Sequence, residues 1–183
     1  MKKLLNILLP LSLFLMLTAS RCRKEELPPE TQEGKNTFGC YVNGELFVPR
    51  GSGLGSIKTC FYQYIYAAEN GYVFYAGGRR EENREGFTKI AIGFDSLQLE
   101  ANKTYKLINV GRGNAYGSYS FAASPLDTIQ NYNTSEINTG ELLVKKFDEI
   151  NHIVSGTFWF TVVKTNGDTV KITDGRFDMP FTR

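Results

Sequence analysis

The side chains in this sequence that could do chemistry are three cysteines, one histidine and a few grouped carboxylates. His152 is the only imidazole that could act as a general base, and it follows Asn151 at the start of an expected strand. Serine–histidine catalysis needs a nucleophile, a base and a carboxylate together, and zinc sites need clustered cysteine or histidine ligands. The sequence therefore predicts a histidine at a strand edge, no metal and no cofactor, and it contains no recognisable catalytic set.

Cys40 and Cys60 leave two interpretations open. Outside the cytoplasm the two thiols could form a disulfide. Closing the chain between them would add roughly 3 kcal/mol and requires Cα atoms within roughly 7 Å. The alternative is two buried, unpaired thiols in neighbouring strands, because buried cysteine behaves as a small hydrophobic residue.

Grouped carboxylates occur in residues 174–178, which read DGRFD, and in residues 79–85, which read RREENRE. A calcium loop needs more carboxylates at tighter spacing, so we expect a bulge or bend at Gly175, with Arg176 available to a carboxylate. Glycoside hydrolysis needs two carboxylates across a defined cleft. On a charged loop tip such as 79–85, solvation is the expected role.

The first 21 residues have the layout of a secretory signal. A basic start at Lys2 and Lys3 precedes an apolar run over 4–17 and small residues at 18–20. A membrane-spanning helix needs roughly 20 apolar residues, so this run is too short to be a good span. We expect residues 1–21 to direct export.

Cys22 stands where a lipoprotein signal ends. Leu17, Ala19 and Ser20 precede it, which resembles the Leu-small-small-Cys pattern at which bacterial lipoproteins are acylated. Arg21 departs from that pattern, and the alternative is cleavage after Ser20 by an ordinary signal peptidase. Residues 23–26 (RKEE) resemble the charged signal that sends lipoproteins of Bacteroidetes to the cell surface. We expect Cys22 to carry lipid.

Residues 22–36 contain prolines, glutamates and glutamines without apolar periodicity. Such a segment cannot bury enough surface to offset the entropy of ordering. The sequence therefore predicts three parts: a signal peptide over 1–21, a lipid-anchored flexible tether over 22–36 and a folded domain over 37–183.

The folded part alternates short apolar runs with turn dipeptides. Asn-Gly, a strong hairpin signal, occurs at 43–44, 70–71 and 166–167. We expect an all-β domain, a single antiparallel β-sandwich or partly open β-barrel of about 8–10 strands joined by hairpins, with at most a short helical turn in 124–135. The expected strands cover 37–42, 45–49, 58–68, 72–78, 87–95, 104–110, 117–123, 140–148, 152–164 and 168–179.

The last hairpin permits a prediction of register. Phe158, Phe160 and Val162 alternate with Thr157, Trp159 and Thr161 along the first strand. A one-residue slip would turn every side chain to the other face, so the consistent apolar pairing decides the loop length. A three-residue loop over 165–167 pairs Val162 with Val170 and Phe160 with Ile172, and it requires Gly167 in the left-handed conformation.

The expected hairpin around 70–71 is rich in tyrosine. A two-residue turn there would place Tyr66 opposite Tyr75 and give one tyrosine face and one phenylalanine face. A tyrosine ring packs on apolar neighbours while its hydroxyl reaches water or a ligand, so we expect the phenylalanine face to point inward. The candidate ligand surface is formed by Tyr62, Tyr64, Tyr66 and Tyr75; the alternative is that these rings pack within the sheet.

The two ends of the domain suggest a family. Residues 37–44 (TFGCYVNG), 155–160 (SGTFWF) and 170–178 (VKITDGRFD) resemble the ends of an uncharacterised lipoprotein family from Bacteroidetes. The resemblance implies an exported, lipid-anchored β domain at the outer membrane, facing the cell surface. It implies no activity.

The charge of the chain excludes one class of partner. Without Lys2, Lys3 and Arg21 the chain has 18 basic against 19 acidic residues. A neutral domain offers no basic surface to a phosphate backbone, so we expect no nucleic acid as a partner. We expect a binding or structural module that meets the membrane through its N-terminal lipid and contacts a glycan or a protein. The alternative is an envelope hydrolase with an unrecognised acidic active site.

Overall fold

The computed structural model describes residues 25–51, 56–66, 71–82 and 86–183. These residues contain eleven strands and no helix, and 61% of them lie in strands or bridges. Among them, no helix is available to cross a membrane. The strands are β1 (Thr37–Val42), β2 (Glu45–Phe47), β3 (Lys58–Ile65), β4 (Gly71–Glu82), β5 (Gly86–Asp95), β6 (Lys103–Leu107), β7 (Ala115–Ala122), β8 (Gln130–Asn133), β9 (Gly140–Asp148), β10 (Ile153–Val163) and β11 (Thr169–Pro180).

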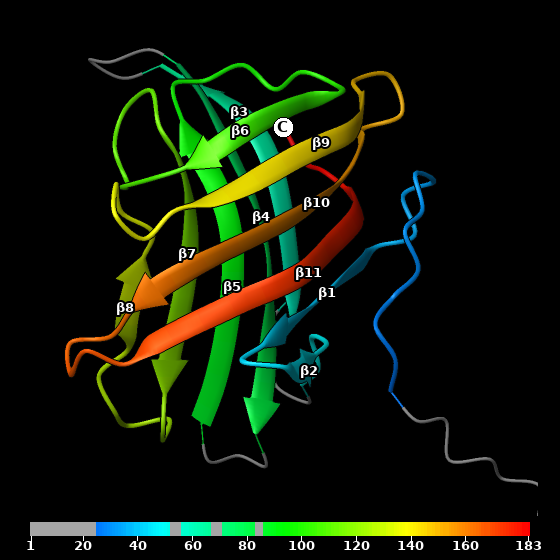
Figure 1. Ribbon diagram of the computed structural model, residues 1–183. Helices are drawn as coiled ribbons and strands as arrows, with labels where there is room; N and C mark the ends of the chain where they lie inside the picture. The colour runs from blue at the N-terminus through cyan, green and yellow to red at the C-terminus, as the bar shows by residue number, and fades with distance from the viewer. Residues whose placement is uncertain (1–24, 52–55, 67–70, 83–85) are drawn as a thin grey trace, which may run out of the picture.

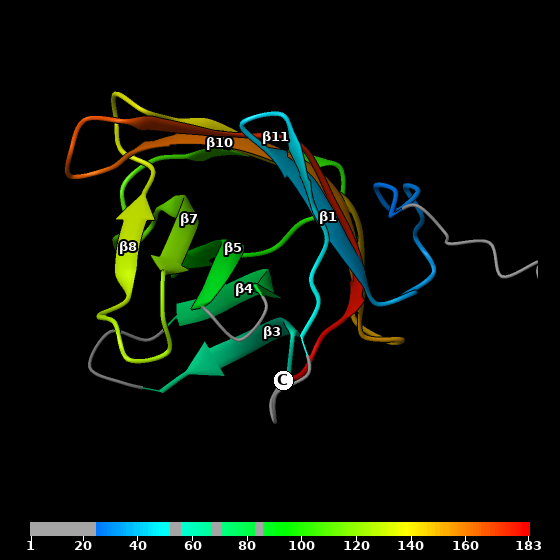
Figure 2. The ribbon, with the colours of Figure 1, turned by 90° about the horizontal axis from the view of Figure 1, so that it is seen from below.

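One continuous sheet folds over to make two layers (Figures 1 and 2). Its hydrogen-bonded order is β2-β1-β11-β10-β9-β6-β7-β5-β4-β3, with β8 beside β7. The front layer holds β1, β11, β10, β9 and β6, whose strands run obliquely across β7, β5, β4 and β3 of the back layer. The sheet turns over between β6 and β7, which form its parallel pair. The sheet is mostly antiparallel and is not closed into a barrel, which confirms the predicted all-β architecture.

Two crossing segments cover part of the free edge of the back layer. After β11 the chain reaches β3, where the N–H of Thr182 donates to the carbonyl of Cys60 at 3.2 Å and its carbonyl accepts from Tyr62 at 2.9 Å. After β2, Arg50 bonds to β4 in the same way, through Arg79 at 3.1 Å and Glu81 at 2.8 Å. Covering an exposed strand edge prevents its pairing with another chain.

Apolar side chains from both layers fill the space between them. Because successive side chains of a strand point to opposite faces, each layer gives one face to this core and keeps the other for solvent. Full burial of one such side chain contributes about 1.5–3 kcal/mol. The largest completely buried residues include Phe38, Phe74, Phe94, Phe160, Ile90, Ile92, Leu107, Leu142 and Ile172.

Cys40 of β1 and Cys60 of β3 belong to this core as two separate thiols. Cys40 lies opposite Phe47, and Cys60 lies opposite Ala76. Burial raises the pKa of both thiols, so they stay protonated and pack as small hydrophobic groups. Of the two interpretations, the structure contradicts the disulfide and supports the unpaired buried thiols, although β1 and β3 are not neighbours in the sheet as that interpretation assumed.

The C-terminal hairpin has the predicted register. Val162 pairs with Val170, and Phe160 pairs with Ile172. The N–H of Gly167 donates to the carbonyl of Lys164 at 2.9 Å, and Gly167 has a φ of +90°. The three-residue loop with a left-handed glycine is therefore confirmed.

The tyrosine hairpin has a different register from the predicted one. Ile65 pairs with Gly71, so the connection spans residues 66–70 instead of a two-residue turn. Tyr62 consequently pairs with Phe74, and Phe61 pairs with Tyr75. The slip moves Tyr75 to the face opposite Tyr62, so the predicted common face of four tyrosines is wrong.

Residues 124–135 contain strand β8 where the sequence suggested at most a helical turn. β8 pairs with β7, with Asn131 opposite Ser120. Its end is fixed by Thr134, whose N–H donates to the carbonyl of Gly117 at 2.9 Å and whose Oγ1 accepts from the N–H of Gly117 at 3.0 Å. These contacts with a distant strand, and not local propensity, make this segment extended.

The N-terminal segment 25–36, which we call the strap, lies against the outer side of β1 and β11 (Figure 1). It is held by Asp178, whose side chain points outward and is covered so that the residue is 1% exposed. The carboxylate accepts hydrogen bonds from the hydroxyl of Thr31 at 2.6 Å and from the backbone N–H groups of Glu33, Gly34 and Lys35 at 3.0, 2.7 and 3.2 Å. The predicted flexible tether is therefore wrong for residues 25–36, and residues 22–24 lie outside the described part.

Asp178 makes the attachment of the strap dependent on pH. Burial alone would raise the pKa of this carboxyl, but the hydrogen bonds from the strap together lower it below its ordinary value. A carboxylate whose pKa is lowered by folding stabilises the protein above its unfolded pKa, about 4. The stabilisation is lost as the pH falls through the lowered folded pKa.

We predict that Asp178→Asn lowers the free energy of unfolding by about 2–3 kcal/mol near neutral pH, because three backbone donors and one hydroxyl lose a charged acceptor. Chemical denaturation measures this loss, and the difference from wild type should shrink below about pH 4. Trypsin should also cut after Lys35 in the variant and spare it in wild type. Asp127→Asn, in an exposed loop, serves as the control; equal effects of both changes would contradict the assignment.

Candidate functional site

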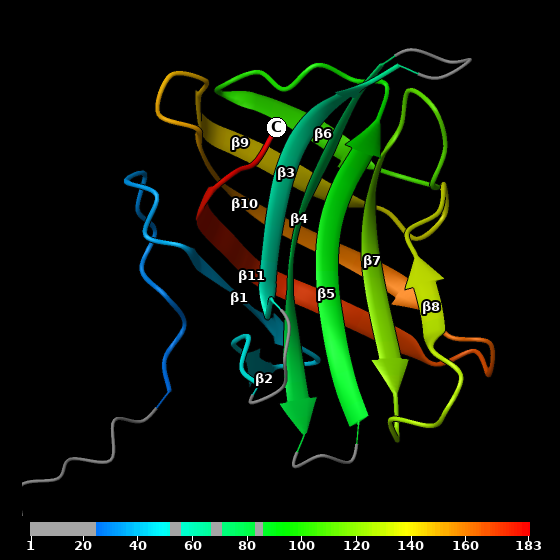
Figure 3. The same cartoon turned by 180° about the vertical axis from the view of Figure 1, so that it is seen from behind.

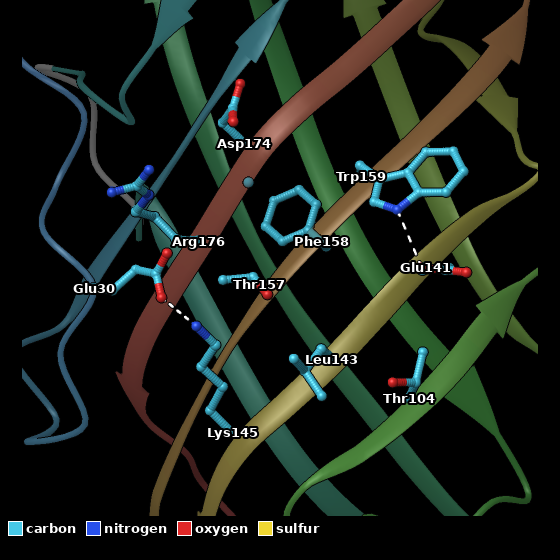
Figure 4. A pocket seen from close by; sticks show the side chains of 11 residues that line it. Glu30, Thr104, Glu141, Leu143, Lys145, Thr157, Phe158, Trp159, Asp174 and Arg176 are labelled. Atoms are coloured by element: carbon cyan, nitrogen blue, oxygen red, sulfur yellow. Dashed lines mark hydrogen bonds and ion pairs between the residues drawn. The ribbon is translucent and has the colours of Figure 1, made fainter.

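The outer face of the front layer carries a groove of about 390 Å³ (Figure 4). We call it the tryptophan groove. Its floor is made by β6, β9, β10 and β11, and the strap forms one wall. The polar and aromatic side chains that line it are Glu30, Thr104, Glu141, Lys145, Thr157, Phe158, Trp159, Asp174 and Arg176.

Trp159 points outward because its neighbours in β10 point inward. Phe158 and Phe160 are buried between the layers, whereas 45% of Trp159 is exposed. Figure 4 shows the indole face-on, spread over the sheet surface. Its Nε1–H donates to Glu141 Oε2 at 3.4 Å, a long hydrogen bond across the β9–β10 pair. One face of the largest aromatic side chain is thus presented to solvent at a fixed place.

A β-bulge in β11 shapes the groove on the side of Trp159 that faces away from Glu141. Phe158 pairs with Gly175 and Phe160 pairs with Ile172, so Thr173 and Asp174 together lie opposite Trp159. Asp174 has a φ of +52°, in the left-handed region that non-glycine residues rarely adopt. Bulges re-aim side chains, and this one directs the Asp174 carboxylate to the groove. The expected bend near Gly175 is therefore present.

Charged side chains from the strap and the sheet meet in the groove. Lys145 of β9 forms an ion pair with Glu30 of the strap, and this contact lowers the pKa of Glu30. Arg176 donates through Nη1 to the carbonyl of Pro28 at 3.3 Å. Its buried Nε–H has no hydrogen-bond partner within the described part of the chain. The strap thus completes the groove and leaves one guanidinium donor unused.

This arrangement offers a stacking surface beside carboxylates, hydroxyls and cations. An aromatic face with hydrogen-bonding groups around it suits a flat polar ligand, because one side of a pyranose ring presents C–H groups while its edge presents hydroxyls. Glu141 and Asp174 could also serve the alternative of an acidic hydrolase. Among the described residues, no three histidine, cysteine, aspartate or glutamate side chains group to hold a metal ion.

The tyrosines of the predicted ligand surface are dispersed by the register of β3 and β4. Tyr62 is only 6% exposed; its ring stacks on Tyr72 at 4.8 Å and meets Phe147 edge-on at 5.1 Å. Tyr64 and Tyr66 are exposed at the end of β3 and contact each other at 4.8 Å. Tyr75 lies on the other face, stacked on Phe61. The four residues form no common surface, and packing in the core is the correct interpretation for Tyr62.

The other candidate residues lie away from the tryptophan groove. His152 is an exposed residue of the β9–β10 turn, with a φ of +52° and its ring 5.3 Å from Phe181. Within residues 79–85, Arg79 pairs with Glu81 at 2.6 Å, and 83–85 lie outside the described residues. Cys22 also lies outside them.

The sequence matches no protein-family model, no curated protein and no solved structure. The chemistry of the site is therefore the available guide to function. Sequence reasoning did not select Trp159, although the signal was present: the single tryptophan of the chain stands among threonines on the polar side of an alternating strand. For Asp174 the sequence indicated only a bulge or bend near Gly175, and the direction of its side chain depends on the pairing of β10 with β11.

We predict that Asp174→Gly raises the free energy of unfolding by roughly 0.5–1 kcal/mol, because glycine adopts a positive φ without steric cost. Thr173→Gly is the matched control. Thr173 has no positive φ, so glycine relieves no strain there. The greater conformational entropy of the unfolded chain should lower the free energy of unfolding by roughly 0.5–1 kcal/mol. Urea denaturation of the two variants measures both changes, and destabilisation by Asp174→Gly would show that the carboxylate itself stabilises the bulge.

Proposed function

We propose that this chain is an exported, lipid-anchored binding module of the cell envelope whose tryptophan groove holds a saccharide. The observation that carries the binding site is the exposed indole face of Trp159, fixed on the sheet beside Glu141 and Asp174. The ring stacks on the C–H face of a sugar, and the carboxylates accept its hydroxyls. The strap keeps Glu30 and Lys145 at the opposite wall.

The envelope location rests on the sequence. Residues 1–21 have the pattern of an export signal, and Cys22 stands at the acylation position with Arg23–Glu26 behind it. A lipid on Cys22 anchors the chain in the outer membrane, and the charged residues direct it to the cell surface. The resemblance to lipoproteins of Bacteroidetes supports the same location.

The binding site is tested with the full chain in detergent and a panel of neutral oligosaccharides. For an oligosaccharide of this panel that the wild-type chain binds, we expect Trp159→Ala to weaken the affinity at least tenfold, which corresponds to about 1.4 kcal/mol. Trp159→Phe should keep part of the affinity because a smaller aromatic face remains. Calorimetry or glycan-array binding measures the change.

Tyr66→Ala is the matched control, because Tyr66 is 88% exposed and lies outside the groove. It should leave the affinity unchanged. Equal losses in Trp159→Ala and Tyr66→Ala, or no saccharide bound by wild type, would contradict the proposed site. Shortened oligosaccharides after incubation would favour the hydrolase alternative.

The anchor is tested separately by intact mass spectrometry of the protein from a bacterial host that processes lipoproteins. We expect an N-terminal Cys22 with acyl chains, and loss of these chains together with loss of membrane association in Cys22→Ala. An unmodified N-terminus at Arg21 would show that ordinary signal peptidase cleaves the chain.

A further inference from the structure

The outer face of the back layer carries a second groove, on the side of the molecule seen in Figure 3. Two adjoining hollows of about 320 and 280 Å³ share Lys89, Ser120 and Asn131. Their floor and walls come from β3, β4, β5, β7, β8 and adjoining loop residues, and none of their lining residues lines the tryptophan groove. We call this surface the lysine groove.

The register of β4, β5, β7 and β8 places its side chains in rows. Arg79 pairs with Lys89, Lys89 with Ser120, and Ser120 with Asn131, so these four residues form one row across the sheet. The hydroxyl of Ser120 donates to Asn131 Oδ1 at 2.7 Å. The row therefore runs from two cations at one end to a hydroxyl and an amide at the other.

The next row on the same face consists of small residues. Gly77 pairs with Ala91, Ala91 with Ser118, and Ser118 with Asn133. A Cβ atom at Gly77 would lie 2.8 Å from the Tyr75 hydroxyl and 2.9 Å from Ala91, so only glycine leaves room for the tyrosine there. The row beyond it places Tyr75 and Tyr116 on either side of Gly93. Small side chains thus separate the cationic row from an aromatic row.

The two cations lie directly opposite each other, an arrangement that destabilises a sheet. Arg79 has a carboxylate partner in Glu81 at 2.6 Å. Lys89 has none among the residues that the structure describes, and its Nζ lies over the ring of Tyr75, 5.1 Å from the centroid. Burial, and then the charge of Arg79, lower the pKa of Lys89. No anion among the described residues offsets the cost of burying this charge beside Arg79.

A second polar group in the lysine groove also lacks a partner. The hydroxyl of Tyr75 is shielded from water and makes no hydrogen bond within the described segments. Burial raises the pKa of Tyr75 to about 12, so the hydroxyl keeps its proton and remains a donor. An unpaired buried polar group destabilises the fold, and an acceptor that entered the groove and reached the hydroxyl would remove that cost.

We propose that the lysine groove binds an acidic saccharide through its carboxylate or sulfate group, held by Lys89 and Arg79. Ser118, Asn131 and Asn133 bond the hydroxyls of the sugar, and the rings of Tyr75 and Tyr116 contact its apolar face. Several polar side chains beside aromatic rings favour a polyol over a membrane surface. The site does not depend on the tryptophan groove, which lies on the other layer.

The test uses the full chain in detergent and two oligosaccharides of equal length, one with uronate or sulfate groups and one neutral. We expect Lys89→Met to weaken the affinity for the acidic oligosaccharide at least tenfold and to leave the midpoint of thermal unfolding unchanged or higher, since a like-charge pair is removed. Added salt should weaken acidic binding by wild type. Trp159→Ala should leave this affinity unchanged, which separates this site from the proposed saccharide site.

Lys164→Met is the matched control, because Lys164 also lies over a tyrosine ring, that of Tyr119 at 5.8 Å, but lines neither hollow of the lysine groove. It should leave the affinity within twofold of wild type. Equal losses in both lysine variants, absence of binding of the acidic oligosaccharide by wild type, or equal affinity of the Trp159→Ala protein for the two oligosaccharides would overturn the proposal. Binding of anionic lipid vesicles with no binding of the acidic oligosaccharide would overturn it as well.

Discussion

The structure depends on the contact between its two layers across a core of phenylalanine and branched aliphatic side chains. Alternate residues of each strand point into this core. The side chains available to bind a ligand are therefore those that point outward between them. Phe158 and Phe160 are buried while Trp159 is exposed, and Ile90 and Ile92 are buried while the outward neighbour Lys89 lies in a groove. The two grooves are therefore consequences of the same pleat, placed back to back on opposite outer faces.

Sequence patterns determine register where the apolar pairing is unambiguous. In the C-terminal hairpin only one loop length puts Val162 beside Val170, and that hairpin forms as predicted. The tyrosine hairpin offers no such choice, because both of its faces are apolar. Asn70-Gly71 then suggested a short turn, but pairing of β4 with β5 and bonding of β3 to Thr182 accompany a different register. The preference of an Asn-Gly dipeptide for a short turn is weaker than the pairing of these strands with their neighbours on both sides.

Features that depend on distant residues were predicted from the sequence only in part or not at all. The bulge at Asp174 exists because ten pairs of β10 and β11 fit on both sides of it, and the strap is ordered because four donors converge on one carboxylate of β11. The strap has the composition of a disordered linker, but composition indicates only how much apolar surface a segment can bury by itself. The strap is held instead by hydrogen bonds to Asp178, which its content of apolar residues does not reveal.

The strap also sets how far a lipid on Cys22 would hold the domain from the membrane. With residues 22–36 free, the chain could extend about 45 Å. Since Asp178, Arg50 and Lys145 hold the strap from Glu25 onward, residues 25–36 stay against the front layer and do not add to that reach. The strap lies beside the tryptophan groove and contributes Glu30 to it. A proposed anchor so close to the front layer places the tryptophan groove nearer to the bilayer than a flexible tether would, while the lysine groove, on the opposite layer, faces away from the strap.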